Sequence, residues 1–129
     1  MSRTARCSCG QLSLQAEGEP VLNALCHCDD CRRRTGSAFG WSAYFLEAQV
    51  VARSGRAIDR SLPVSEPQHR HFCPDCGTTL WWTVATAPGL IGVSAGTFEA
   101  GSLGEPIASY RDGQSCEWLT LPETWVRYS

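Results

Sequence analysis

The chain has 129 residues, of which 43% are hydrophobic, so we predict one domain over residues 1–129 with a core of its own. A formal net charge of −2 argues against a general nucleic-acid partner, and no apolar run approaches the ~18 residues of a membrane span. All eleven basic residues are Arg, which excludes lysine chemistry such as a Schiff base.

Eight cysteines are many for a chain of this size. Residues 1–6 lack the apolar segment of a signal peptide, so we expect a reducing, cytoplasmic location rather than a secreted disulfide scaffold. In that setting clustered cysteines are more often metal ligands.

The first cysteines lie in Cys7-Ser8-Cys9-Gly10, where Gly10 allows a tight turn. Apolar and polar residues alternate over 12–16, which predicts a half-buried strand. After a turn at 18–20, residues 21–25 are expected to form a second strand that leads into the next cysteines.

The run Cys26-His27-Cys28-Asp29-Asp30-Cys31 places three sulfurs within six residues. The backbone between them is too short for unstrained disulfides, whereas Zn²⁺ can gather thiolates at about 2.3 Å. No fourth ligand follows in the run, so the fourth position is either supplied from elsewhere or open. An open position distinguishes a catalytic zinc from a structural one.

Residues 32–37 are predicted to form a short helical turn ended by Gly36. Strands are expected at 39–46 and 49–53, followed by a loose stretch at 55–68 with one weak strand. The motif Cys73-Pro74-Asp75-Cys76-Gly77 has the form of a zinc knuckle, for which Cys7 and Cys9 are the available partners. This pairing leaves the Cys26 triplet as a separate site.

Strands are also predicted at 78–84 and 90–95, with a turn-rich stretch at 97–106 and an edge strand at 107–110. Gly and Pro recur between these short segments and no long helical periodicity appears, so the predicted fold class is mainly β. Trp81 and Trp82 cannot both face one side of a strand, so one is expected in the core and the other is a candidate for a pocket wall.

Several other polar side chains are candidates. His27 lies between two ligands and should face away from their metal in an extended backbone, which favours a structural role over proton transfer or ligation. Arg32, Arg33 and Arg34 follow the triplet and are either solvated or able to bind a carboxylate in bidentate fashion. If residues 69–73 are extended, His69 and His71 share a strand face with Cys73, and they are either exposed or close to the metal of the knuckle.

Taken together, Cys7-Ser8-Cys9-Gly10, Cys26-His27-Cys28-Asp29-Asp30-Cys31-Arg32 and Phe72-Cys73-Pro74-Asp75-Cys76-Gly77 resemble the glutathione-dependent formaldehyde-activating enzyme family, also named for the centromere protein V group. Gly36-Ser37-Ala38-Phe39 and Trp118-Leu119-Thr120-Leu121-Pro122 extend the resemblance over nearly the whole chain. It implies an Mss4-like β-tent of stacked antiparallel sheets built around zinc. It also implies two Zn²⁺ per chain, a structural ion on Cys7, Cys9, Cys73 and Cys76 and a second ion on Cys26, Cys28 and Cys31.

The activity implied by the resemblance is that of a carbon–sulfur lyase or synthase, which joins glutathione and formaldehyde into an S-hydroxymethyl adduct. The catalytic candidates are then Cys26, Cys28, Cys31 and His27, with Arg32 and Arg33 as candidates for binding the carboxylates of glutathione. A non-catalytic zinc-stabilised β module that binds a partner is the alternative, and thiol redox chemistry at the triplet is a third. The oligomeric state stays open, with a homodimer as one option.

Overall fold

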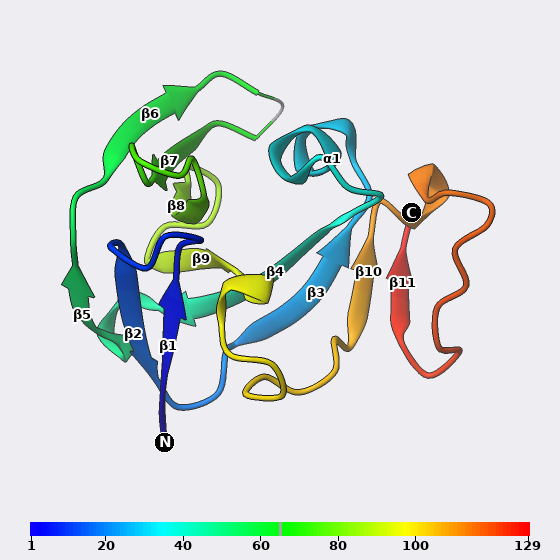
Figure 1. The fold of residues 1–129 in the computed structure, drawn as a ribbon. Helices are drawn as coiled ribbons and strands as arrows, with labels where there is room; N and C mark the ends of the chain where they lie inside the picture. The colour runs from blue at the N-terminus through cyan, green and yellow to red at the C-terminus, as the bar shows by residue number, and fades with distance from the viewer. Residues whose placement is uncertain (65) are drawn as a thin grey trace.

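The computed structural model describes residues 1–64 and 66–129. Over these residues the chain forms eleven strands, one α-helix and three short 3₁₀ helices (Figure 1). The strands are β1 (Ser2–Arg6), β2 (Ser13–Glu17), β3 (Leu22–Cys26), β4 (Gly40–Leu46), β5 (Val50–Ser54), β6 (Ile58–Leu62), β7 (Gln68–Phe72), β8 (Thr79–Val84), β9 (Leu90–Ser94), β10 (Ala108–Tyr110) and β11 (Val126–Tyr128). The helices are α1 (Asp29–Thr35) and the 3₁₀ turns Glu47–Gln49, Ala95–Thr97 and Asp112–Gln114.

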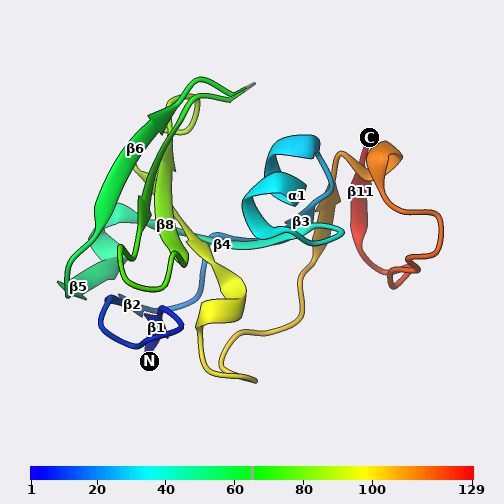
Figure 2. The ribbon, with the colours of Figure 1, turned by 45° about the horizontal axis from the view of Figure 1, so that its top comes forward.

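The described strands form two sheets. The smaller has the order β1-β2-β5, and the larger has the order β11-β10-β3-β4-β9-β8-β7-β6. Pairing is antiparallel except around β10, which runs parallel to both β3 and β11. Figure 2 shows that the large sheet is strongly bent, with β6 and β8 upright and β3 and β4 running across, and that α1 lies in the angle between these two parts.

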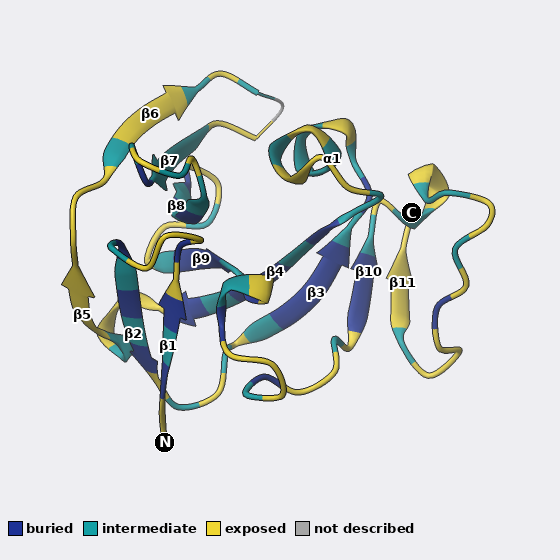
Figure 3. Cartoon of the chain, viewed as in Figure 1, coloured by how far each residue is buried: buried dark blue, intermediate teal, exposed yellow. Residues whose placement is uncertain are grey.

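The core lies between the two sheets, as the buried faces in Figure 3 show. Burial alternates along the strands that line it: in β2 every second residue, beginning with Leu14, is buried. Leu14, Phe45 and Val93 are fully buried and come from three different strands. Alternation of this kind is what a sheet with one face on a core requires, so the mainly β prediction with stacked sheets is confirmed.

Two strands lie where none was predicted. β1 contains a single buried apolar residue, Ala5, and its other buried side chain is Arg3, which donates hydrogen bonds to Gly18 O and Glu19 Oε1. β11 is fully exposed and therefore shows no alternation. Because β11 covers the outer side of β10, the predicted edge position of residues 107–110 is wrong.

The helix after the triplet begins three residues earlier than predicted. Cys28 caps its N-terminus, because the Cys28 side chain accepts a hydrogen bond from the Cys31 backbone N–H. Gly36 ends it in the left-handed region at a φ of 66°, as predicted. No helix among the described residues combines the length and the apolar character needed to cross a bilayer.

The Trp82 side chain on β8 packs directly against Gly92 on β9. A Cβ atom at Gly92 would lie 2.4 Å from Trp82 Nε1, and Trp82 is 1% exposed. We therefore expect Gly92→Ala to lower the free energy of unfolding by about 1–3 kcal/mol, as overpacking of a core usually does. Urea denaturation measures the change, and Gly104→Ala is the matched control because nothing lies within 4 Å of its added methyl group. Equal effects of the two substitutions would contradict the close packing.

Candidate functional site

The first cysteine cluster joins the two sheets. Cys7 and Cys9 follow β1 of the small sheet, and Cys73 and Cys76 follow β7 of the large one. Their four sulfurs lie within 4.8 Å of one another, with 3.6 Å between Cys7 and Cys9 and 3.7 Å between Cys9 and Cys73. Sulfurs held at tetrahedral angles about 2.3 Å from one ion would be about 3.8 Å apart, so these four fit Zn²⁺.

Three sulfurs of this cluster have hydrogen-bonding partners outside it. The Leu12 backbone N–H donates to Cys7 Sγ at 3.3 Å, and Gln11 Nε2 donates to Cys73 Sγ at 3.0 Å. The Thr78 hydroxyl and backbone N–H lower the pKa of Cys76 to about 5. A closed set of four cysteine sulfurs with hydrogen-bonded neighbours is the arrangement of a structural zinc site.

The second cluster lies where β3 ends and α1 begins. Cys26 is the last residue of β3, Cys28 is the helix cap and Cys31 lies in the first turn of α1. Cys26 Sγ is 3.4 Å from Cys28 Sγ, and the three sulfurs lie within 4.8 Å of one another. The Cys31 thiol lowers the pKa of Cys26 to about 6, assisted by the Cys28 backbone N–H and the Arg111 charge. The donor set and spacing again fit a thiophilic ion such as Zn²⁺.

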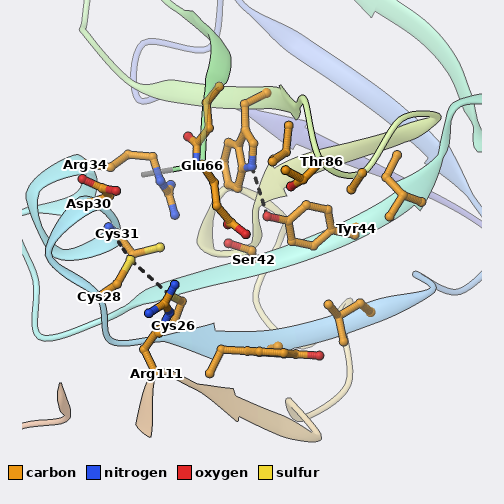
Figure 4. Close-up of a pocket in the computed structure, with 18 of the residues that line it drawn as sticks. Cys26, Cys28, Asp30, Cys31, Arg34, Ser42, Tyr44, Glu66, Thr86 and Arg111 are labelled. Atoms are coloured by element: carbon orange, nitrogen blue, oxygen red, sulfur yellow. Dashed lines mark hydrogen bonds between the residues drawn. The ribbon is translucent and has the colours of Figure 1, made fainter. Parts of the chain in front are cut away.

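The two clusters differ in their number of ligands. Within residues 1–64 and 66–129, no fourth His, Cys, Asp or Glu ligand atom joins the group formed by Cys26, Cys28 and Cys31. The three residues instead line a cavity of about 270 Å³. Figure 4 shows their side chains at one end of this cavity, with Arg34 and Arg111 projecting toward them. This cluster is therefore open on one side, where two guanidinium groups and the Asp30 carboxylate line the cavity.

The arginines that line the cavity are not the two that were predicted. Arg32 pairs with Asp29 on the surface of α1, and Arg33 is exposed and outside the cavity lining. Arg34 lines the cavity instead, where it donates to Ser94 Oγ at 3.2 Å. Arg34 lies three residues after Cys31, so both side chains are on one face of α1. This spacing is the sequence signal by which Arg34 could be identified.

Arg111 also lines the cavity. No spacing in the sequence relates Arg111 to the cysteines of this cluster. It follows β10, whose Tyr110 lies opposite Cys26 in the parallel pairing with β3. Its backbone has a φ of 53°, which is the left-handed region that non-glycine residues seldom adopt. The pairing of β10 with β3 therefore brings Arg111 beside the Cys26 cluster.

His27 lies outside the group of sulfurs. Its ring is fully buried, and its Nε2 is 2.9 Å from Ser109 Oγ on β10, which itself donates to Asp112 at 2.7 Å. Burial lowers the pKa of His27, which favours the neutral ring. The ring thus ties the turn between Cys26 and Cys28 to β10.

The other aromatic and histidine candidates are divided between the two faces of the large sheet. Trp82 lines the cavity, whereas Trp81 packs against the core, as the alternation predicted. His71 stacks on Trp81 with 3.5 Å between ring centroids, and His69 Nε2 lies 2.6 Å from Asp59 Oδ2. Neither histidine belongs to a cysteine cluster.

These features define a small β protein with a closed four-sulfur centre between its sheets and an open three-sulfur centre in a cavity. The chain belongs to the glutathione-dependent formaldehyde-activating enzyme family, whose sequence profile matches residues 2–112. The fold is similar to a crystal structure of a Rhodobacter sphaeroides protein from structural genomics, with a TM-score of 0.61 and 19% identity. That match covers 75% of this chain and 88% of the other. No curated protein matches the sequence significantly.

Proposed function

We propose that this protein joins the thiol of glutathione to formaldehyde at a zinc ion held by Cys26, Cys28 and Cys31. The observation that carries the proposal is the open three-sulfur cluster, which faces a cavity together with two guanidinium groups. Family membership supplies the substrate classes, glutathione and formaldehyde. We assign a structural zinc to Cys7, Cys9, Cys73 and Cys76, so that the loaded chain carries two ions.

The reaction is an addition that needs no oxidant or reductant. The sulfur of glutathione attacks the carbonyl carbon and forms the carbon–sulfur bond, the π electrons of the carbonyl move to its oxygen, and that oxygen receives the proton lost by the thiol. A free thiol is only a few per cent thiolate at neutral pH. Zinc, when bound, would supply a thiol-binding position and favour the thiolate.

The chain's own side chains would bind and orient the substrate. Three cysteine thiolates and a divalent ion carry a charge of −1 together, and Arg34 and Arg111 lie beside them to balance a further thiolate or a carboxylate. His27 acts as a positioning residue, because its bond to Ser109 holds the backbone between two of the ligands. All eight cysteines are free of disulfides, which suits the reducing cytoplasm.

Removing the Arg34 charge is expected to weaken glutathione binding. Hydrogen bonds to charged groups contribute about 1.5–3 kcal/mol, so Arg34→Gln should raise the KM for glutathione by about tenfold or more. Arg33→Gln is the matched control, because that side chain is exposed one position earlier on the same helix. Steady-state kinetics on both variants measures the difference. A KM that rises equally in both would remove Arg34 from the binding site.

The proposal is tested by measuring metal content on freshly reduced protein while glutathione is titrated and zinc X-ray absorption is followed. We expect two zinc ions per chain, one of which gains a sulfur neighbour as glutathione is added. One zinc per chain with no response to glutathione would overturn the proposal. It would favour a zinc-stabilised module that binds a partner.

A further inference from the structure

The cavity beside the Cys26 cluster extends well beyond its sulfurs. Leu22 and Cys26 are the first and last residues of β3, and both line the cavity together with Ala24 between them. Four steps of about 3.3 Å along a strand make this floor about 13 Å long. Ser42 and Tyr44 on β4 lie opposite Ala24 and Leu22 and continue the same face.

The two ends of the cavity differ in chemistry. At the sulfur end it is lined by charged and metal-ligating groups, namely Cys26, Cys28, Asp30, Cys31, Arg34 and Arg111. Glu66 also lines the cavity and lies between Arg34 and Tyr44 in Figure 4, so one carboxylate stands between the two ends. At the far end the lining is mostly apolar and includes Leu22, Val84, Ala87 and Leu90. Figure 4 shows the cysteines at one side and Tyr44 and Thr86 at the other.

Trp82 and Tyr44 form part of the wall between the two ends. Trp82 Nε1–H donates to the Tyr44 hydroxyl at 3.2 Å, and the two rings meet edge to face with centroids 6.2 Å apart. The Arg34 guanidinium lies 4.1 Å from the centre of the Trp82 ring on the sulfur side. The indole N–H is thus satisfied within the protein, and the far end presents apolar surface.

Neither glutathione nor formaldehyde carries a group that suits this apolar end. Apart from its thiol, the functional groups of glutathione are amides, carboxylates and an ammonium group, and burying such groups against apolar walls costs free energy. Formaldehyde has two non-hydrogen atoms and occupies only the carbonyl position beside the sulfur. An apolar chain on the carbonyl carbon would extend from the sulfur end over Tyr44 toward Leu22.

Building on the proposed function, we infer that the carbonyl substrate is an aldehyde with an apolar substituent of several carbons. The thiol sulfur attacks the aldehyde carbon and forms the carbon–sulfur bond, and the carbonyl oxygen takes the proton lost by the thiol. The product is a hemithioacetal whose alkyl chain lies in the apolar end of the cavity. No further reactant is needed.

The first test compares aldehydes of increasing length on the two-zinc protein. Formaldehyde, propanal and hexanal are mixed with glutathione, and exchange with the adduct is followed by NMR with and without enzyme. We expect kcat/KM, divided by the uncatalysed rate constant of the same aldehyde, to rise about tenfold or more from formaldehyde to hexanal. Acceleration of formaldehyde alone would overturn this inference and leave the proposed function standing. Acceleration of none would overturn both.

The second test measures binding without turnover. S-methylglutathione and S-hexylglutathione are stable analogues of the adduct, and calorimetry gives their Kd values. Full burial of one methylene strengthens binding by about fourfold, and S-hexylglutathione has five more methylenes than S-methylglutathione. Even about twofold for each would make S-hexylglutathione bind about 30-fold more tightly, which is the smallest difference we expect. Equal affinities in the unmodified protein would overturn the inference.

Two variants at Leu22 test whether the alkyl chain lies in the apolar end of the cavity. Leu22→Trp fills the apolar end and Leu22→Asp makes it polar, so each should reduce the ratio of the two affinities by at least about fivefold. Val51→Trp, an exposed residue on β5 of the other sheet, is the control and should leave the ratio unchanged. If either folded Leu22 variant keeps the full ratio, the alkyl chain does not lie against Leu22.

Discussion

Cys73→Ser is expected to unfold the domain or to leave it with one metal ion in place of two. Cys73 is fully buried, and its sulfur lies 3.7 Å from Cys9 Sγ in the neighbouring sheet. A structural zinc site contributes about 10–16 kcal/mol in zinc-finger peptides. The net stability of a whole domain is only about 5–15 kcal/mol. Loss of zinc from this site would therefore remove a contribution as large as the free energy of unfolding of the whole domain.

Circular dichroism and metal content per chain measure the outcome. Cys116→Ser is the matched control, since Cys116 is a partly buried cysteine outside both clusters and should keep both ions and the fold. A Cys73→Ser protein that stays folded with two ions would disprove the structural assignment of this cluster. The location of Cys73 between the sheets means that a variant which loses this ion also loses a link between them.

The cysteine clusters could be predicted from the sequence because their spacing restricts local geometry. With only one or two residues between cysteines, the backbone can place their sulfurs in few arrangements. Most of these arrangements allow one ion to bind all the sulfurs. Pairing Cys7 and Cys9 with Cys73 and Cys76 followed from elimination, since the triplet already accounted for the other clustered thiols. The structure brings both predicted groups together.

The cavity could not be predicted, because it depends on strand order. Arg111 reaches Cys26 through the parallel pairing of β10 with β3, which joins segments more than eighty residues apart and leaves no local pattern. The strand at residues 107–110 was predicted at an edge for a similar reason: β11, which covers it, is exposed and, with three residues, is too short to show a periodicity. Arg34 was one of three arginine candidates, and it could be chosen over Arg32 and Arg33 only once the helix was known to begin at Asp29 rather than Arg32.

The orientation of His27, by contrast with the cavity, could be predicted from the sequence. Alternation along an extended backbone predicted that it faces away from the sulfurs, and the structure places its ring against Ser109 and Phe39. This local rule held because Cys26 still belongs to β3. Its proposed positioning role follows from those contacts rather than from its place in the motif.

Cys28→Ser is expected to separate folding from metal binding at the second site. Cys28 caps α1 with its side chain, and serine is among the best N-cap residues, so the helix should begin at the same place. The thiolate ligand is nevertheless lost, and two sulfurs with an open side bind zinc poorly. We expect a folded protein with one zinc ion instead of two, and a loss of at least about 100-fold in thiol–aldehyde acceleration.

The same measurements that follow Cys73→Ser distinguish the two sites. Circular dichroism should report the native fold for Cys28→Ser while metal analysis reports one remaining ion, held by the four-sulfur centre. Global unfolding of this variant would contradict separate roles for the two clusters, and unchanged activity with one ion would remove the triplet from the reaction. Because serine preserves the helix cap, any loss of activity in the folded variant can be attributed to the missing sulfur rather than to a displaced helix.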